Sequence, residues 1–93
     1  MIVIDIGNTN IVIGLFSKKK LNLCIRIPTS EKKLLDTLDY YFNSNKINLS
    51  ELAYNRCIMS SVSSLPTAKI ISFFKKKKIN TLNINLNNIP KKF

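Results

Sequence analysis

The residues best suited to chemistry lie together near the N-terminus, in the hexapeptide Asp5-Ile6-Gly7-Asn8-Thr9-Asn10. Gly7 lets the backbone approach a ligand closely and adopt positive φ without steric cost. Successive backbone N–H groups in such a turn form a concavity that binds anions, and the three polar residues after Gly7 add short side-chain donors. Asp5 would repel a bare phosphate, so its natural partner is a hydrated divalent cation carried on that phosphate. The hexapeptide therefore predicts a site for a phosphate group with magnesium.

Two apolar runs, Ile2-Val3-Ile4 and Ile11-Val12-Ile13, flank this hexapeptide and position it. Strand-forming runs on either side of a short polar turn are typical of a β-hairpin. Both glycines of the 93-residue chain lie within residues 2–16. An ordinary hairpin, with Asp and Asn present only for their turn chemistry, is the alternative interpretation.

The rest of the chain predicts three further strands and two helices. Alternation over residues 21–27 indicates a half-buried strand, and Leu34, Leu35, Leu38, Tyr41 and Phe42 recur at the spacing of an amphipathic helix. The expected elements are a strand at 21–27, a helix at 31–44, a strand at 57–59, a helix from Pro66 with Lys75 to Lys78 in its last turn, and a strand through Leu82, Ile84 and Leu86. Thr29 or Ser30 is the expected N-cap of the first helix. The predicted order is β-β-β-α-β-α-β.

These motifs resemble a known family, the type III pantothenate kinases of the actin-like ATPase superfamily. That family opens with a strand, then D-x-G-N-T-N, then a second apolar strand, as residues 5–12 do here. Arg26 to Thr29 is similar to its R-x-x-T, and Met59 to Val62 to its strand ending in S-S-V, although residues 63–66 read S-S-L-P where the family usually has prolines. The resemblance implies an α/β fold: the ribonuclease-H-like half of an actin-like ATPase, with a mixed five-stranded sheet.

The resemblance also implies a function: ATP-dependent phosphorylation of pantothenate, the first step of coenzyme A biosynthesis. Residues Asp5, Ile6, Gly7, Asn8, Thr9, Asn10, Ile11 and Val12 would then bind the ATP phosphates, with Asp5 orienting hydrated magnesium. The family also implies a monovalent cation (potassium or ammonium) and a homodimer. Its catalytic carboxylate lies in a G-A-D-R motif and its second phosphate hairpin in D-x-G-T, and neither occurs in this sequence. Residues 1–93 are thus expected to be one N-terminal subdomain without the C-terminal half, and without a catalytic residue of its own.

Two other functions follow from different interpretations. The first is a truncated, non-catalytic remnant that binds nucleotide weakly or associates with a partner chain. The second is a nuclease, because ribonuclease H shares the half-fold. Two-metal nuclease chemistry needs clustered carboxylates. The chain has five acids, and the strand beside Asp5 ends in Met59-Ser60-Ser61 where a metal ligand would be needed, so the nuclease hypothesis is rejected.

The net charge of +10 suggests nucleic acid or a membrane surface as a partner. Lysine supplies 13 of the 15 basic residues, and Lys, Asn and Ile fill 39 of 93 positions, which is the signature of A/T-rich codons. We therefore expect no specific nucleic-acid partner. No stretch approaches the length of a membrane span, and Asp5 interrupts the apolar N-terminal run that a signal peptide would need. A cytoplasmic protein is expected, with Cys24 and Cys57 reduced and half-buried.

Overall fold

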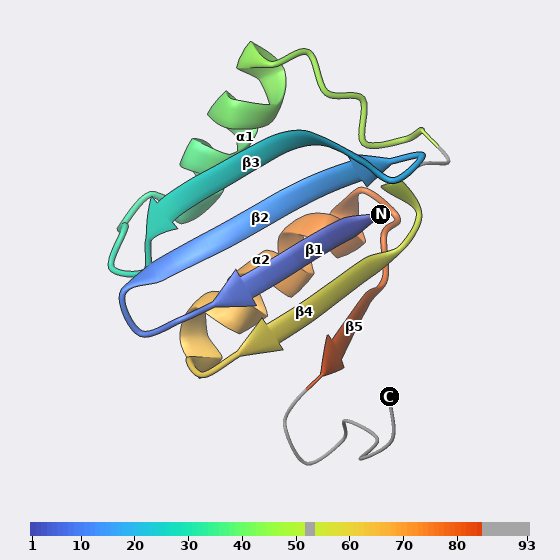
Figure 1. The fold of residues 1–93 in the computed structure, drawn as a ribbon. Coiled ribbons are helices and arrows are strands. Elements are labelled where there is room, and N and C mark those ends of the chain that lie inside the picture. The colour runs from blue at the N-terminus through green and yellow to red at the C-terminus, as the bar shows by residue number, and fades with distance from the viewer. Residues whose placement is uncertain (52–53, 85–93) are drawn as a thin grey trace.

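The computed structural model describes residues 1–51 and 54–84 and shows a mixed five-stranded sheet with two helices. The elements are β1 (Ile2–Ile6), β2 (Asn10–Ser17), β3 (Lys20–Pro28), α1 (Leu34–Ser44), β4 (Cys57–Ser61), α2 (Ser64–Lys76) and β5 (Thr81–Ile84). Both helices lie on the same face of the sheet (Figure 1). The α/β class and the order of elements predicted from the sequence are confirmed.

The strand order across the sheet is β3-β2-β1-β4-β5, with β1 at the centre. β1 pairs antiparallel with β2 and parallel with β4, while β2 and β3 are antiparallel and β4 and β5 parallel. β1, β3, β4 and β5 therefore all run in one direction, and their carboxyl ends meet at one edge of the sheet. The hairpin turn between β1 and β2 lies at this edge, and both helices begin from it (Figure 1).

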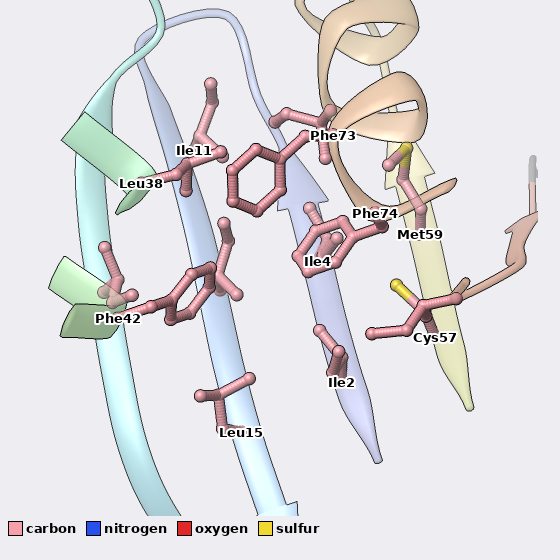
Figure 2. Packing of buried hydrophobic residues seen from close by; sticks show 14 of the residues in the cluster. Ile2, Ile4, Ile11, Leu15, Leu38, Phe42, Cys57, Met59, Phe73 and Phe74 are labelled. Carbon is pink, nitrogen blue, oxygen red and sulfur yellow. The ribbon is translucent and has the colours of Figure 1, made fainter. Parts of the chain in front are cut away.

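The core lies between the sheet and the helices and follows the two-residue period of the strands. Ile2, Ile4 and Ile6 of β1 are each at most 1% exposed, whereas Val3 and Asp5 between them are exposed. Figure 2 shows Phe73 and Phe74 of α2 and Phe42 of α1 over this isoleucine-rich face, with Met59 and Cys57 of β4 beside them. Each large apolar side chain buried in this way contributes about 1.5–3 kcal/mol.

The helix starts differ from those predicted. α1 begins at Leu34 rather than at residue 31, and no side chain caps it. Thr29, the expected cap, is used elsewhere, and the carboxylate of Glu31 instead accepts the N–H of Lys33 at 3.1 Å. α2 begins two residues before Pro66, which costs nothing because the first-turn N–H groups have no intrahelical partner.

Three other details bear on the sequence predictions. Lys75 and Lys76 lie in the last turn of α2 as expected, but Lys77 is its C-cap and Lys78 follows it with φ 63°. Of the predicted last strand, residues 85 and 86 lie outside the described residues. The cysteines are not both half-buried: Cys24 is exposed and Cys57 is buried, and burial raises the pKa of the Cys57 thiol. In the described part of the chain, no helix is long and apolar enough to span a membrane.

Candidate functional site

The turn between β1 and β2 is a tight connection of three residues, Gly7, Asn8 and Thr9, with Asn8 and Thr9 at its exposed tip. Ile6 pairs with Ile11, and beyond that pair the N–H of Gly7 donates to the carbonyl of Asn10 at 2.9 Å. Ile6 and Ile11 are fully buried, so they anchor the turn in the core rather than face a ligand.

Gly7 performs a different task from the one predicted. No glycine among the described residues has positive φ, so conformational freedom is not why the position suits glycine. A Cβ at Gly7 would lie 3.2 Å from the carbonyl oxygen of Asn10, tighter than an ordinary contact, and that neighbour is backbone. Glycine is therefore favoured here by the close approach of two backbone segments of the hairpin, a reason different from the approach to a ligand that the sequence predicts.

Two segments distant in sequence hold this turn. The hydroxyl of Thr29, just after β3, donates to the carbonyl of Gly7 at 2.9 Å, and the Thr29 N–H donates to the carbonyl of Thr9 at 2.9 Å. On the other side, the N–H of Val62, just after β4, donates to the carbonyl of Ile6 at 3.0 Å. The three motifs recognised in the sequence, D-x-G-N-T-N, R-x-x-T and S-S-V, are thus joined directly at one edge of the sheet.

The polar groups at the tip of the turn are left free by this arrangement. Among the described residues, neither the N–H groups nor the side chains of Asn8 and Thr9 make a hydrogen bond. The N–H of Gly7 is already used within the hairpin. Any anion bound here would therefore be met by donors of Asn8 and Thr9 and by the side-chain amide of Asn10, which also makes no hydrogen bond among the described residues.

Asp5 lies near the carboxyl end of β1 and is exposed on the face of the sheet opposite the helices. Its neighbours across the sheet are Val12 on β2 and Ser60 on β4. Ser60 is also exposed, so an acid and a hydroxyl stand side by side, close to the turn. Within the described residues, the Asp5 carboxylate has no ion pair or hydrogen bond.

The Asp5 carboxylate fits a magnesium ion carried on a nucleotide. Mg²⁺ keeps several waters and is usually held by one or two carboxylates together with substrate phosphates. An unpartnered, exposed carboxylate beside a turn with free donors meets that requirement. The described residues contain no group of three Cys, Asp or Glu side chains that would make a dedicated metal cage.

The two serines that end β4 have different environments. The hydroxyl of Ser61 accepts the N–H of Ser63 at 3.1 Å and contacts the hydroxyl of Thr67 in α2. Ser61 is thus a structural residue that ties the end of β4 to the first turn of α2. Ser60 makes no such contact and faces the Asp5 side of the sheet. Of the two serines, Ser61 therefore holds the end of the strand in place, and Ser60 is the one that is exposed beside Asp5.

A cleft of 430 Å³ opens beside the turn, between Asn8, the segment after β3 and the start of α2. Thr29, Ser63 and Lys69 are among its lining residues. The first turn of α2 carries no acidic residue, so the positive end of the helix dipole is not offset there. This cleft, whose lining is partly apolar, adjoins the turn at the carboxyl ends of the strands, where open α/β sheets bind their ligands.

The role of Thr29 is what sequence reasoning missed. Its position after a strand and before a helix made it a candidate N-cap, whereas its hydroxyl and its N–H both hold the phosphate-type turn. The only sequence signal for this role is its place in the R-x-x-T motif, because nothing local distinguishes a capping threonine from one that reaches 22 residues back along the chain.

Comparison with known proteins agrees with these motifs. The family model for type III pantothenate kinase matches residues 1–91. A type III pantothenate kinase of Ehrlichia canis (strain Jake) is 32% identical over 87 residues, covering 91% of this chain and 31% of that protein. Another, of Ehrlichia ruminantium (strain Welgevonden), is 31% identical over 64 residues, covering 67% of this chain and 25% of that protein.

The matched segment is thus a limited part of the relatives: the chain spans about a quarter to a third of their length. Within that part, the match includes β1, β2 and the turn between them. It also includes Thr29 and Val62, which hold this turn in place. Sequence, fold and contacts agree, and this chain belongs to the type III pantothenate kinase family.

Proposed function

We propose that this chain supplies the ATP-phosphate wall of a pantothenate kinase site. The observation that carries the proposal is the turn at Asn8 and Thr9, which is held from both sides by Thr29 and Val62 and keeps its own donors free next to the unpartnered Asp5 carboxylate. Free donors on a rigid turn suit phosphate oxygens, and the adjacent acid suits the hydrated cation that accompanies them.

Phosphoryl transfer from ATP to the pantothenate hydroxyl depends mainly on positioning and on stabilising charge. Within such a site, the turn would bind the phosphates and Asp5 would orient water on magnesium. The ion, when bound, neutralises charge that develops on the phosphate oxygens. Activation of the acceptor hydroxyl needs a further carboxylate, for which the family uses its G-A-D-R motif, absent from this sequence. The chain is therefore proposed to bind nucleotide and to rely on other residues for catalysis.

Titration calorimetry with ATP and magnesium tests the binding step. Asp5→Asn should weaken magnesium-dependent ATP binding at least tenfold while the fold is retained, because Asp5 is exposed. Chelating the magnesium should lower wild-type affinity toward that of the variant. Asp36→Asn is the matched control, since it changes the net charge equally from an exposed position on α1. Equal affinities of wild type and Asp5→Asn would remove the site assignment.

A kinase assay tests the second step. Alone, the 93-residue chain should not phosphorylate pantothenate measurably, because it offers one wall of the site. Positioning contributes up to about 7–11 kcal/mol to such reactions, and a general base adds roughly 10²–10⁴-fold. Turnover by the purified chain that is abolished in Asp5→Asn would contradict the proposal, because the chain would then be a complete enzyme.

A further inference from the structure

Basic side chains gather at the edge of the sheet opposite the candidate site. Both helices begin at the carboxyl ends of the parallel strands and therefore end at this opposite edge, where the turn between β2 and β3 also lies (Figure 1). Nine of the fifteen Lys and Arg residues belong to this region, and all nine are exposed. They are residues 18–20, Lys46, Arg56 and residues 75–78, called the basic edge here.

Few acidic groups offset the charge of the basic edge. Three of the five acids lie toward the candidate site, on β1 and around the start of α1. One ion pair forms among the described residues, between Lys77 Nζ and Asp39 Oδ1 at 3.8 Å. The other eight basic residues of the edge therefore make no ion pair within the described part of the chain. Their charges are free to attract an anion from solution.

The backbone of the basic edge places lysine where lysine is sterically unfavourable. All non-glycine residues with positive φ in the described ranges 1–51 and 54–84 are lysines of this edge: Lys18, Lys19, Lys46 and Lys78, with φ from 51° to 65°. Gly and Asn adopt this left-handed conformation more readily, because a bulkier side chain clashes with the following carbonyl oxygen. Three separate turns of the chain thus carry lysine in spite of their geometry.

Both helices end in the same motif. In α1 the N–H of Ile47 donates to the carbonyl of Phe42 at 2.9 Å, and in α2 the N–H of Ile79 donates to the carbonyl of Phe74 at 2.9 Å. The residue before each isoleucine is a left-handed lysine, at the position where helices most often carry glycine. The helix dipole favours cations in a last turn, but α1 has none in its last turn and the hairpin turn has no such dipole.

Composition explains the number of lysines but not these positions. Asn is also encoded by A/T-rich codons, occurs 12 times in this chain and tolerates the left-handed conformation better than Lys. A codon bias alone would therefore leave Asn in at least some of these turns. The consistent use of lysine indicates that positive charge is needed at this edge.

We propose that the basic edge binds the phosphate backbone of a nucleic-acid duplex, without reading its sequence. The five strands span about 19 Å at about 4.8 Å between neighbours, and a duplex presents about 11 charges over that length, one per about 1.7 Å of its axis. Nine basic residues match this charge density. The duplex would lie at the edge opposite Asp5, so this binding is independent of the proposed function.

The side chains of the basic edge favour a duplex over other polyanions. Single strands are bound by exposed aromatic rings on which bases stack, whereas Phe73, the ring beneath Lys77, is buried. Surfaces that enter anionic membranes insert aromatic or aliphatic side chains. The tip of the hairpin turn, Lys18 and Lys19, has none, and the half-exposed Leu21 lies within β3 behind it. A duplex requires neither stacking nor insertion.

Fluorescence anisotropy with a labelled DNA duplex of about 20 base pairs tests the proposal, over about 50–200 mM salt. The 93-residue chain should bind two unrelated sequences equally. A plot of log K against log salt should have a slope of about −4 or steeper, because each neutralised phosphate contributes about −0.9. A flatter slope, or affinities that differ tenfold between the two sequences, would overturn the proposal.

Lys18→Asn combined with Lys19→Gly removes two charges from the basic edge and relieves left-handed strain, so a loss of binding will not reflect unfolding. Affinity for the duplex should fall at least tenfold at about 0.1 M salt, and the slope should become shallower by about 2. Lys78→Asn is a second such variant, because Asn accepts the conformation of this residue. It should make the slope shallower by about 1.

Lys32→Asn combined with Lys33→Asn is the matched control. It removes the same charge from exposed positions just before α1, at the other edge of the sheet. β3 alone spans about 26 Å between the two edges, well beyond the Debye length of about 10 Å at 0.1 M salt. The control should therefore change affinity less than threefold. Equal losses in the two double variants would overturn the proposal in favour of diffuse net charge.

Two further probes separate the duplex from other polyanions. A single strand of the same length should bind less tightly than the duplex at equal phosphate concentration. Vesicles of phosphatidylcholine and phosphatidylserine should also bind less tightly, measured by co-sedimentation. Tighter binding of the single strand, or of the vesicles, would overturn the proposal and identify the basic edge as a site for that other partner.

Discussion

The chain contains two hairpin turns at opposite ends of β2, and they are built on different principles. The turn between β2 and β3 consists of Lys18 and Lys19, enclosed by the paired residues Ser17 and Lys20. The turn between β1 and β2 consists of Gly7, Asn8 and Thr9, one residue more than the lysine turn. Both are short connections between antiparallel strands, and they differ mainly in what holds their backbone in place.

The lysine turn is determined locally. Lys18 and Lys19 have φ of 51° and 65°, as a type I′ turn requires, although Asn-Gly is the preferred pair for that geometry. Both side chains are exposed, and the strained left-handed backbone is confined to these two residues. The Asn8–Thr9 turn shows no positive φ and is held by Thr29 and Val62 from other parts of the chain. The two turns therefore differ in what holds their backbone, a left-handed conformation in one and the contacts of Thr29 and Val62 in the other, while the N–H groups and side chains at both tips make no hydrogen bond among the described residues.

Among the changes that test this comparison of the two turns, Gly7→Ala should cause the largest loss in the free energy of unfolding. The new Cβ would press on a backbone oxygen, and displacing that oxygen would also disturb the contacts of Thr29. We expect a loss of about 2 kcal/mol in the free energy of unfolding, measured by urea denaturation, within the usual range for overpacking. Gly14→Ala is the control, because its Cβ would meet the ring of Phe16, a side chain that can turn aside. A larger loss for Gly14→Ala would refute this explanation of Gly7.

Thr29→Val should have the next largest effect. It removes the hydroxyl that donates to the Gly7 carbonyl but preserves the shape of the side chain. The expected loss is about 1–1.5 kcal/mol by urea denaturation, with several-fold weaker binding of magnesium-ATP by calorimetry. Thr37→Val in α1 serves as the control, since Thr37 is also half-buried and makes no side-chain hydrogen bond. If Thr29→Val left the affinity for magnesium-ATP unchanged, the contacts of Thr29 with the turn would not contribute to nucleotide binding.

Replacing Lys18 and Lys19 together by Asn-Gly should have the smallest effect and the opposite sign. The substitution relieves left-handed strain at two positions, so the chain should gain about 0.5–1 kcal/mol in the free energy of unfolding. Affinity for magnesium-ATP should not change, because this turn lies at the far end of the sheet from Asp5. A thermal melt together with the same calorimetric titration checks both statements. A changed ATP affinity would show that the two turns are coupled.

Much of the architecture was predictable because it depends on periodicity. The alternation of Ile2, Ile4 and Ile6 with Val3 and Asp5 sets which face of β1 is buried, and helical spacing locates α1 and α2 to within a few residues. The hairpin turn between β1 and β2 was predictable for a related reason, since all its residues are adjacent in sequence. Helix starts were less predictable, because Thr29 had two possible partners and only packing chose between them.

The sequence by itself determined the elements, their order and the family, because local propensity and contiguous motifs carry that information. Only the tertiary structure decided that Thr29 and Val62 would hold the turn between β1 and β2, that Ser61 would be structural while Ser60 faces outward, and that Val3, Ile58 and Leu82 would become neighbours across the sheet. These facts depend on which strands become neighbours and in what register. A shift of one residue would turn every side chain of a strand to the other face, and that choice is made by packing across the whole sheet.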